Sequence, residues 1–160
     1  MGNSNIRFKI AQNNEQLQAI YAFRYKIYIQ EMGKTIKDVD HNKQLLKDHR
    51  DDDAVQFFLE DDDGVFACLR TFFSSDTSIT STEIKDYGLE KFLAFNPSSI
   101  CLSGKLMIDA KKRNSSALGI LLGSAYKYGR ERGVKFDFCN CAPSLVQLYE
   151  MLGTVGIKKT

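Results

Sequence analysis

The fold of this chain is most constrained by an apolar run at residues 100–108 that leads into a basic loop of small residues. The run has the length and composition of a buried strand. A helical apolar spacing follows at residues 115–132, and Gly133 predicts the end of that helix. A strand that passes through such a loop into a helix can hold phosphate, because the N–H groups and the positive dipole end of a helix N-terminus favour an anion.

The other patterns predict alternating strands and helices without a linker or an internal repeat. The Asp-Asp-Asp-Gly sequence at 61–64 indicates a hairpin turn. We expect strands at residues 6–10, 54–60, 65–73, 100–108 and 134–141, and helices at 14–30, 84–95, 115–132 and 144–152. Residues 34–53 form a polar loop, and 155–157 start one more strand. This order predicts an α/β (α+β) sandwich around a mixed central sheet, with residues 1–160 as a single domain.

Composition narrows the class of protein. With 43% hydrophobic residues among 160, the chain has enough apolar material for one core. A net charge of +2 lacks the basic bias of a nucleic-acid binder. The N-terminus has no apolar signal region, and no apolar run reaches membrane-spanning length. We therefore expect a soluble, cytoplasmic chain without a nucleic-acid partner or a membrane span.

The cysteines and acidic triplets do not form a recognisable metal site. Cys139 and Cys141 are a C-x-C pair, and His41 and His49 lie far from them in sequence. This spacing predicts reduced thiols rather than zinc or a disulfide framework. The acidic triplets at 51–53 and 61–63 lack calcium-loop spacing, and no G-x-S-x-G elbow indicates a hydrolase.

Three short motifs carry a family resemblance. Residues 20–33 read IYAFRYKIYIQEMG, residues 51–54 and 67–71 read DDDA and ACLRT, and residues 148–153 read LYEMLG. Together they resemble the acyl-homoserine-lactone synthases and N-acyl amino acid synthases, which are relatives within the GNAT-fold acyltransferases. The resemblance covers roughly residues 17–153.

The resemblance implies a GNAT-like mixed sheet flanked by helices, in which a C-terminal hairpin follows the last strand. Here the hairpin is cut short, so either it is truncated or the sheet closes differently. It also implies a co-substrate, the phosphopantetheine thioester of acyl-CoA or of an acyl carrier protein, without a metal. Acyl carrier protein is the expected macromolecular partner, and an amine or amino acid is the expected small-molecule partner.

One departure bears on the acceptor. The lactone synthases carry Glu-x-x-Arg on the fourth strand, whereas residues 102–105 read Leu-Ser-Gly-Lys, so only the cation Lys105 survives. The missing carboxylate argues against lactone synthesis and favours N-acylation of an amine, with its general base unassigned. The resemblance implies three substrate-binding residues: Arg24, Arg70 and Lys105. For Arg24 and Arg70, a structural ion pair is the alternative.

The phosphate loop also departs from the family, whose pattern is Arg/Gln-x-x-Gly-x-Gly/Ala. Arg113 holds the first position, Ser116 and Leu118 replace the small residues, and Gly119 comes one position late. We expect cofactor contacts from Met107, Ile108, Arg113, Ser115, Ser116, Ala117 and Gly119. The alternative is a surface loop with a serine cap before an amphipathic helix. Lys111, Lys112 and Arg113 form a basic edge that suits a phosphate or an acidic carrier protein, or a solvated charge run.

Two catalytic residues are expected. Tyr149 matches the family's tyrosine and can protonate the leaving thiolate, although a half-buried packing tyrosine explains it equally well. Gly104 can adopt a bulge on the fourth strand and present a backbone N–H to the thioester carbonyl. The pantetheine arm should lie along residues 100–108, where that strand separates from 134–141.

Three functions remain open from the sequence. They are transfer of a long acyl chain, an acetyl-CoA-dependent N-acetyltransferase, and a silent GNAT-like binding or regulatory module. A surplus of large side chains predicts either an acyl tunnel or a filled core. These side chains are Tyr21, Phe23, Tyr25, Ile27, Tyr28, Phe57, Phe58, Phe66, Phe72 and Phe73.

Overall fold

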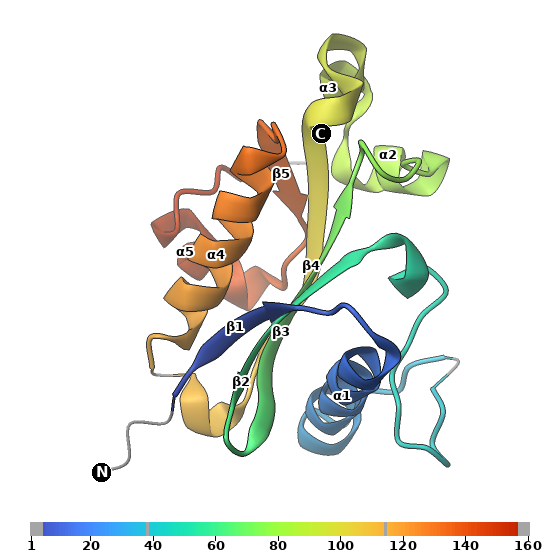
Figure 1. Ribbon diagram of the computed structural model, residues 1–160. Coiled ribbons are helices and arrows are strands. Elements are labelled where there is room, and N and C mark those ends of the chain that lie inside the picture. The colour runs from blue at the N-terminus through green and yellow to red at the C-terminus, as the bar shows by residue number, and fades with distance from the viewer. Residues whose placement is uncertain (1–4, 38, 114, 157–160) are drawn as a thin grey trace.

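A single mixed sheet runs through the molecule (Figure 1). The computed structural model describes residues 5–37, 39–113 and 115–156. The five strands follow the order β1-β2-β3-β4-β5, with every neighbouring pair antiparallel except β4 and β5, which are parallel. Their bounds are β1 Arg7–Ile10, β2 Val55–Asp61, β3 Gly64–Phe73, β4 Ile100–Ile108 and β5 Phe136–Cys139.

Helices cover both faces of the sheet. They are α1 Asn14–Tyr25, α2 Ser81–Tyr87, α3 Glu90–Phe95, α4 Ala117–Glu131 and α5 Val146–Met151. A π-helical segment, Lys26–Glu31, continues α1 directly. The side chain of Asn13 caps α1 by accepting a hydrogen bond from the Gln16 N–H at 2.9 Å, as asparagine at an N-cap commonly does.

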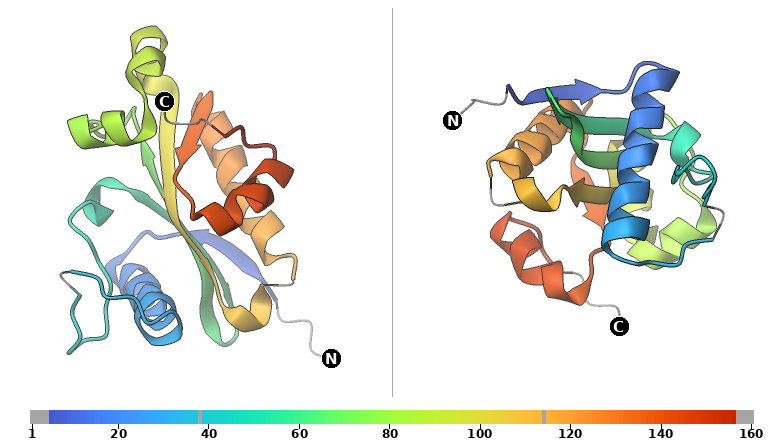
Figure 2. Two further views of the ribbon diagram at one scale, coloured as in Figure 1. Left: turned by 180° about the vertical axis from the view of Figure 1, so that it is seen from behind. Right: turned by 90° about the horizontal axis from the view of Figure 1, so that it is seen from below.

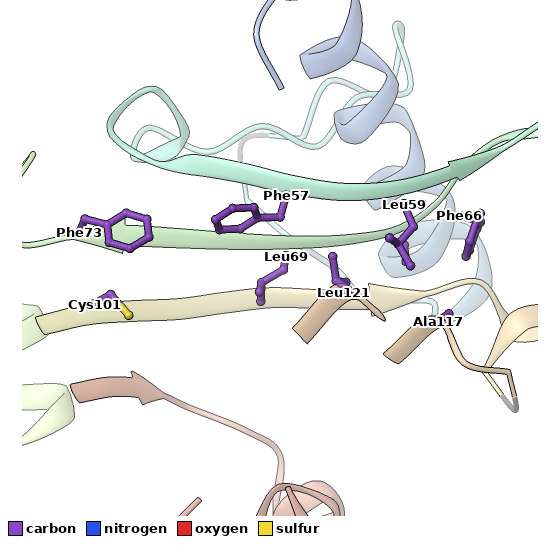
Figure 3. Packing of buried hydrophobic residues seen from close by; sticks show 9 residues of the cluster. Phe57, Leu59, Phe66, Leu69, Phe73, Cys101, Ala117 and Leu121 are labelled. Atoms are coloured by element: carbon purple, nitrogen blue, oxygen red, sulfur yellow. The ribbon is translucent and has the colours of Figure 1, made fainter. Parts of the chain in front are cut away.

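The alternation of side chains along the strands divides the core between the two faces. Phe57 packs with Leu121 of α4 on one face, and Phe58 packs with Ile20 of α1 on the other. Figure 3 shows the α4-side cluster, in which side chains of β2 and β3 point toward α4. The α2–α3 segment covers the remaining part of the α1 face around Leu89 and Leu102 (Figure 2). The predicted α/β sandwich is therefore confirmed.

Several predicted elements differ in their bounds. The helix expected at 84–95 is two helices, because Gly88 adopts a left-handed φ of 65° that ends α2. A capping box between Thr80 and Glu83 starts α2 earlier than the apolar spacing indicated. The strand expected at 134–141 is only Phe136–Cys139. Val155 and Gly156 lie in no strand, and Ile157 is outside the described residues.

Candidate active site

The parallel strands β4 and β5 separate partway along their length. They pair from Ile100 with Phe136 to Ser103 with Cys139, and the described part of the chain shows no pairing between them beyond that point. Residues 104–108 of β4 therefore have an open edge on the β5 side. The separation predicted from the sequence is confirmed.

The main-chain groups of Ile108 face this open edge. The N–H of the next residue, Asp109, donates to the Phe66 carbonyl of β3 at 2.8 Å, so the groups of Ile108 point the opposite way by strand alternation. Met107 differs, because its side chain is only 4% exposed in the α1-side core. Its main-chain groups point toward β3, where Met107 pairs with Cys68. Of the two predicted cofactor contacts on β4, only Ile108 therefore faces the open edge.

The predicted bulge is present on β4, but Gly104 does not form it. Cys68 pairs with Met107 and Arg70 pairs with Gly104, which leaves one extra residue on β4. Lys105 takes the left-handed conformation, with a φ of 55°. A non-glycine residue there is strained by on the order of 1 kcal/mol and persists where surrounding contacts hold it.

Two contacts hold the bulge. The Lys105 carbonyl accepts a hydrogen bond from Cys68 Sγ at 3.5 Å, and Lys105 Nζ lies 3.4 Å from Asp48 Oδ2. A Cβ built on Gly104 would meet nothing within 4 Å, and its φ is not positive. The conformational reason given for a glycine at position 104 was therefore wrong.

We expect Gly104→Ala to change the free energy of unfolding by no more than about 0.5 kcal/mol, since neither sterics nor φ opposes the new methyl group. Gly88→Ala is the matched comparison, because its φ of 65° penalises any side chain and should cost about 1 kcal/mol. Urea unfolding of both variants checks this. Equal destabilisation would contradict the open surroundings of Gly104.

A buried charge network lies under the site on the α1 face. Arg24, which is fully buried, donates to Asp51 at 2.8 Å and to Gln56. Arg70 donates to both oxygens of Asp48 at 2.7 Å and to Asp51 at 3.1 Å. Burial opposes ionisation of Asp48, but the hydrogen bond and charge of Arg70 outweigh it and lower the pKa of Asp48 to about 2. For Arg24, the network supports the structural alternative to a substrate clamp.

Lys105 joins this network from β4. Its side chain is 21% exposed, and Nζ lies 5.7 Å from the centroid of the Tyr28 ring. Burial lowers the pKa of Lys105, the charges of Arg70 and Arg24 lower it further, and only Asp48 opposes them. The ammonium form is therefore less favoured here than on an exposed lysine.

Tyr149 lies on α5, near the end of β5. Burial raises the pKa of its hydroxyl to about 12, and Cys139, Cys141, Asp137 and Tyr28 add to this shift through their charges. These neighbours belong to β5, to the residues just after it and, in the case of Tyr28, to the π-helical segment. The hydroxyl remains protonated at neutral pH, as a proton donor requires.

Asp137 is a titratable residue that the sequence reasoning missed. It pairs in register with Cys101, within the short segment over which β4 and β5 are hydrogen-bonded. Crowding by protein atoms raises the pKa of Asp137, while hydrogen bonds with Ser103 and Cys101 oppose the shift. The residue as a whole is exposed, so solvent moderates the effect. The sequence did contain a signal for this residue, because Asp137 is the one charged residue in the apolar strand β5.

Arg113 is already engaged in the folded chain. Its Nε donates to the Ile108 carbonyl at 3.0 Å, and its guanidinium pairs with Glu31 of the π-helical segment. Lys112 pairs with Asp61 at 2.8 Å. Two of the three cations in the predicted basic edge are thus neutralised by acids of the same chain.

The side chain of Ser115, in the loop just before α4, caps the start of this helix. Ser115 Oγ donates to the Lys112 carbonyl at 2.6 Å and accepts from the Ala117 N–H at 3.2 Å. Ala117 is fully buried, so neither its side chain nor its N–H is open to a cofactor. Ser116 and Gly119 are exposed at the helix start and remain available. Asn114 of this loop lies outside the described residues.

Two surface hollows lie away from this site. One, of about 230 Å³, is lined by residues including Asn13, Phe58 and Val65, and the other, of about 200 Å³, by residues including Tyr21 and Lys47. Neither touches the open edge of β4. Within the described ranges, no helix is long and apolar enough to cross a membrane, and no group of three or more His, Cys, Asp or Glu side chains is arranged to hold a metal. All four cysteines are free thiols.

Solved structures share this fold at low sequence identity. The CoA-dependent acyl-homoserine lactone synthase BjaI, solved with SAM and isopentyl-CoA, matches with a TM-score of 0.74 and 12% identity, over 94% of this chain and 74% of BjaI. The synthase LasI matches with a TM-score of 0.67 and 13% identity, over 94% and 79%. A GCN5-related N-acetyltransferase from Ralstonia eutropha JMP134 matches with a TM-score of 0.66 and 13% identity, over 98% and 96%.

Family membership comes from a sequence model. A search of curated protein sequences gave no match. Residues 23–123, which include the end of α1, the β2–β3 hairpin, β4 and the start of α4, match the model described as "Acetyltransferase (GNAT) domain". This match spans more than half of the chain, and the fold agrees with it. The chain therefore belongs to the GNAT acetyltransferase family and is an acyltransferase of the GNAT type.

Proposed function

We propose that this chain transfers an acyl group from a phosphopantetheine thioester to the amine of a small molecule such as an amino acid. The single observation that carries the proposal is the open edge of β4 after the Ser103–Cys139 pair, with Tyr149 near the end of β5. An extended arm that bears amides can pair with such an edge as an added strand does.

The same geometry supplies the elements of acyl transfer. The bulge at Lys105 turns the main chain where the thioester carbonyl would lie, and a preorganised N–H there stabilises the developing oxyanion. The attacking amine forms the C–N bond as the C–S bond breaks, and Tyr149 gives its proton to the departing thiolate.

The acceptor follows from the fourth strand. Leu102, at the position of the family's glutamate, is buried in the cluster around Leu89 and Phe138. It offers no carboxylate for a lactone-forming reaction, although BjaI is described as a lactone synthase. N-acylation without ring closure suits this strand better.

Acyl-chain length separates two candidate functions. A long acyl chain needs a tunnel, which the ten large side chains named in the sequence analysis could line. An acetyl group needs no tunnel, so the same side chains are free to fill the core. Of the ten side chains, all but Tyr28 are buried in the core. This filled core is the specific observation that favours an acetyl-CoA-dependent N-acetyltransferase as the second candidate.

Donor binding should decide between them. Under the long-chain proposal, dodecanoyl-CoA should bind more than a hundredfold tighter than acetyl-CoA, because each buried methylene adds about 0.8 kcal/mol. Isothermal titration of acetyl-, octanoyl- and dodecanoyl-CoA measures this, with free CoA as the control for the shared nucleotide. Equal affinities for all three thioesters would leave the acetyltransferase as the function.

Product analysis tests the reaction itself. The purified chain is incubated with acyl-CoA, or with acylated carrier protein, and a mixture of the amino acids, and N-acyl products are read by mass spectrometry. N-acyl amino acids are the expected products. Donor binding without any product from either thioester source would select the silent binding or regulatory module instead.

A further inference from the structure

We propose that Lys105 is the general base of this acyltransferase: its side-chain amine takes the proton that the acceptor ammonium must lose before attack. The inference deepens the proposed function and rests on it. It assigns the base that the missing β4 carboxylate left open.

The charges of the buried network point to Lys105. Three cations, Arg24, Arg70 and Lys105, meet two carboxylates, Asp48 and Asp51. Each carboxylate is already bonded by an arginine, Asp51 by Arg24 at 2.8 Å and Asp48 by Arg70 at 2.7 Å. Lys105 lies farther from its carboxylate, at 3.4 Å, and is the surplus positive charge.

Burial and the charges of Arg70 and Arg24 favour the neutral form of Lys105, whereas Asp48 and the Tyr28 ring favour its ammonium form. Asp48 from the loop, Arg70 and Cys68 from β3, Arg24 from α1 and the Tyr28 ring from the π-helical segment face it. The arginines do not deprotonate in proteins, and the Cys68 thiol has its pKa raised by burial. Lys105 is therefore the member of the network that most readily releases its proton, and buried lysines serve as bases for this reason.

The position of Lys105 suits contact with the acceptor. It is the bulge residue, two positions after Ser103, which is the last β4 residue that pairs with β5, so its main chain lies near the start of the open edge. Its side chain turns toward the Asp48 and Tyr28 side and keeps 21% of its surface exposed. An amine entering on the α1 face of β4 can reach Nζ, whereas Tyr149 lies near the β5 end, where the thiolate departs.

The proton balance closes with residues of this chain. Neutral Lys105 removes one proton from the acceptor ammonium, and the free amine attacks the thioester carbonyl. The C–N bond forms and the C–S bond breaks, with Tyr149 protonating the thiolate. The attacking nitrogen loses its second proton once the C–N bond has formed, and that proton restores Tyr149. Lys105 releases its proton to solvent, so the reaction releases one proton overall and both residues return to their starting states.

The first test measures the chemical reactivity of the Lys105 amine and does not require enzymatic turnover. The amines of the folded chain are labelled with trace acetic anhydride across a pH series, and the Lys105 peptide is quantified by mass spectrometry against N-α-acetyl-lysine. Half-maximal labelling of Lys105 should come at a lower pH than that of the standard. Asp48→Asn should lower this midpoint further, because it removes the one carboxylate that favours the ammonium. A midpoint at or above the standard would overturn the inference, whether or not the proposed reaction is found.

The second test separates a base from a fixed charge. Lys105→Arg keeps the positive charge but cannot deprotonate. Lys105→Met has neither the charge nor a group that can exchange a proton. Both should lower kcat about a hundredfold at pH 7 while donor affinity stays within about twofold. The Lys105→Met rate should recover as the pH approaches that of acceptor deprotonation. Near-normal turnover of Lys105→Arg would show a charge role and overturn the proposal; circular dichroism confirms that both variants fold.

Discussion

Tyr149→Phe is expected to lower kcat on the order of a hundredfold while leaving the dissociation constant of the acyl donor nearly unchanged. The phenylalanine keeps the aromatic ring of this α5 residue and removes only the hydroxyl, whose pKa of about 12 keeps it protonated at neutral pH. A proton donor acts in the transition state, so its loss appears in turnover rather than in binding. Steady-state release of free thiol, followed together with donor titration, measures both quantities.

Tyr126→Phe is the matched control for this experiment. Tyr126 lies on α4 and is 65% exposed, so removing its hydroxyl should change neither turnover nor affinity. If Tyr149→Phe keeps full turnover, Tyr149 is a packing residue and the thiolate takes its proton from another source.

Asp51→Asn is expected to lower the free energy of unfolding by about 3–5 kcal/mol. Asp51 is 2% exposed and is bonded by both Arg24 and Arg70. The amide keeps the volume of the carboxylate but removes its charge, which leaves the fully buried Arg24 without a counter-ion. Urea unfolding monitored by circular dichroism measures the change.

Its neighbour in the same acidic triplet provides the control. Asp52 pairs with Lys47 at the surface, where the two side chains are 69% and 44% exposed. Asp52→Asn should cost no more than about 0.5 kcal/mol, because exposed ion pairs contribute little. If Asp51→Asn and Asp52→Asn lower the free energy of unfolding by similar amounts, the buried Arg24–Asp51 ion pair does not stabilise α1.

Local chemistry made much of the fold predictable. The Asp-Gly turn located the β2–β3 hairpin, and the period-two alternation of its strands places Phe57 and Phe58 on opposite faces. The break at Gly88 was missed because an isolated glycine inside a helical apolar spacing reads equally as an interior residue or as a C-cap. Only the packing of Leu89 against the sheet separates the two.

The site was predicted less completely because its key pairs are distant in sequence. Arg24 and Asp51 are 27 residues apart and Arg70 and Asp48 are 22 apart, and no local periodicity links them. The bulge residue was assigned to Gly104 by intrinsic preference, whereas tertiary contacts to Cys68 and Asp48 hold Lys105 in that conformation instead.

The π-helical segment after α1 has a consequence for how relatives are compared. The Met32 N–H bonds to the Ile27 carbonyl five residues back, so this turn encloses one residue more than an α-helical turn. One residue rotates a helix face by about 100°. Ile27 stays in the core, while the Glu31 carboxylate reaches Arg113. An alignment with a relative that lacks the π turn would need a one-residue gap within Lys26–Glu31; without that gap, residues on the two sides of the turn would be matched to the wrong face of the helix.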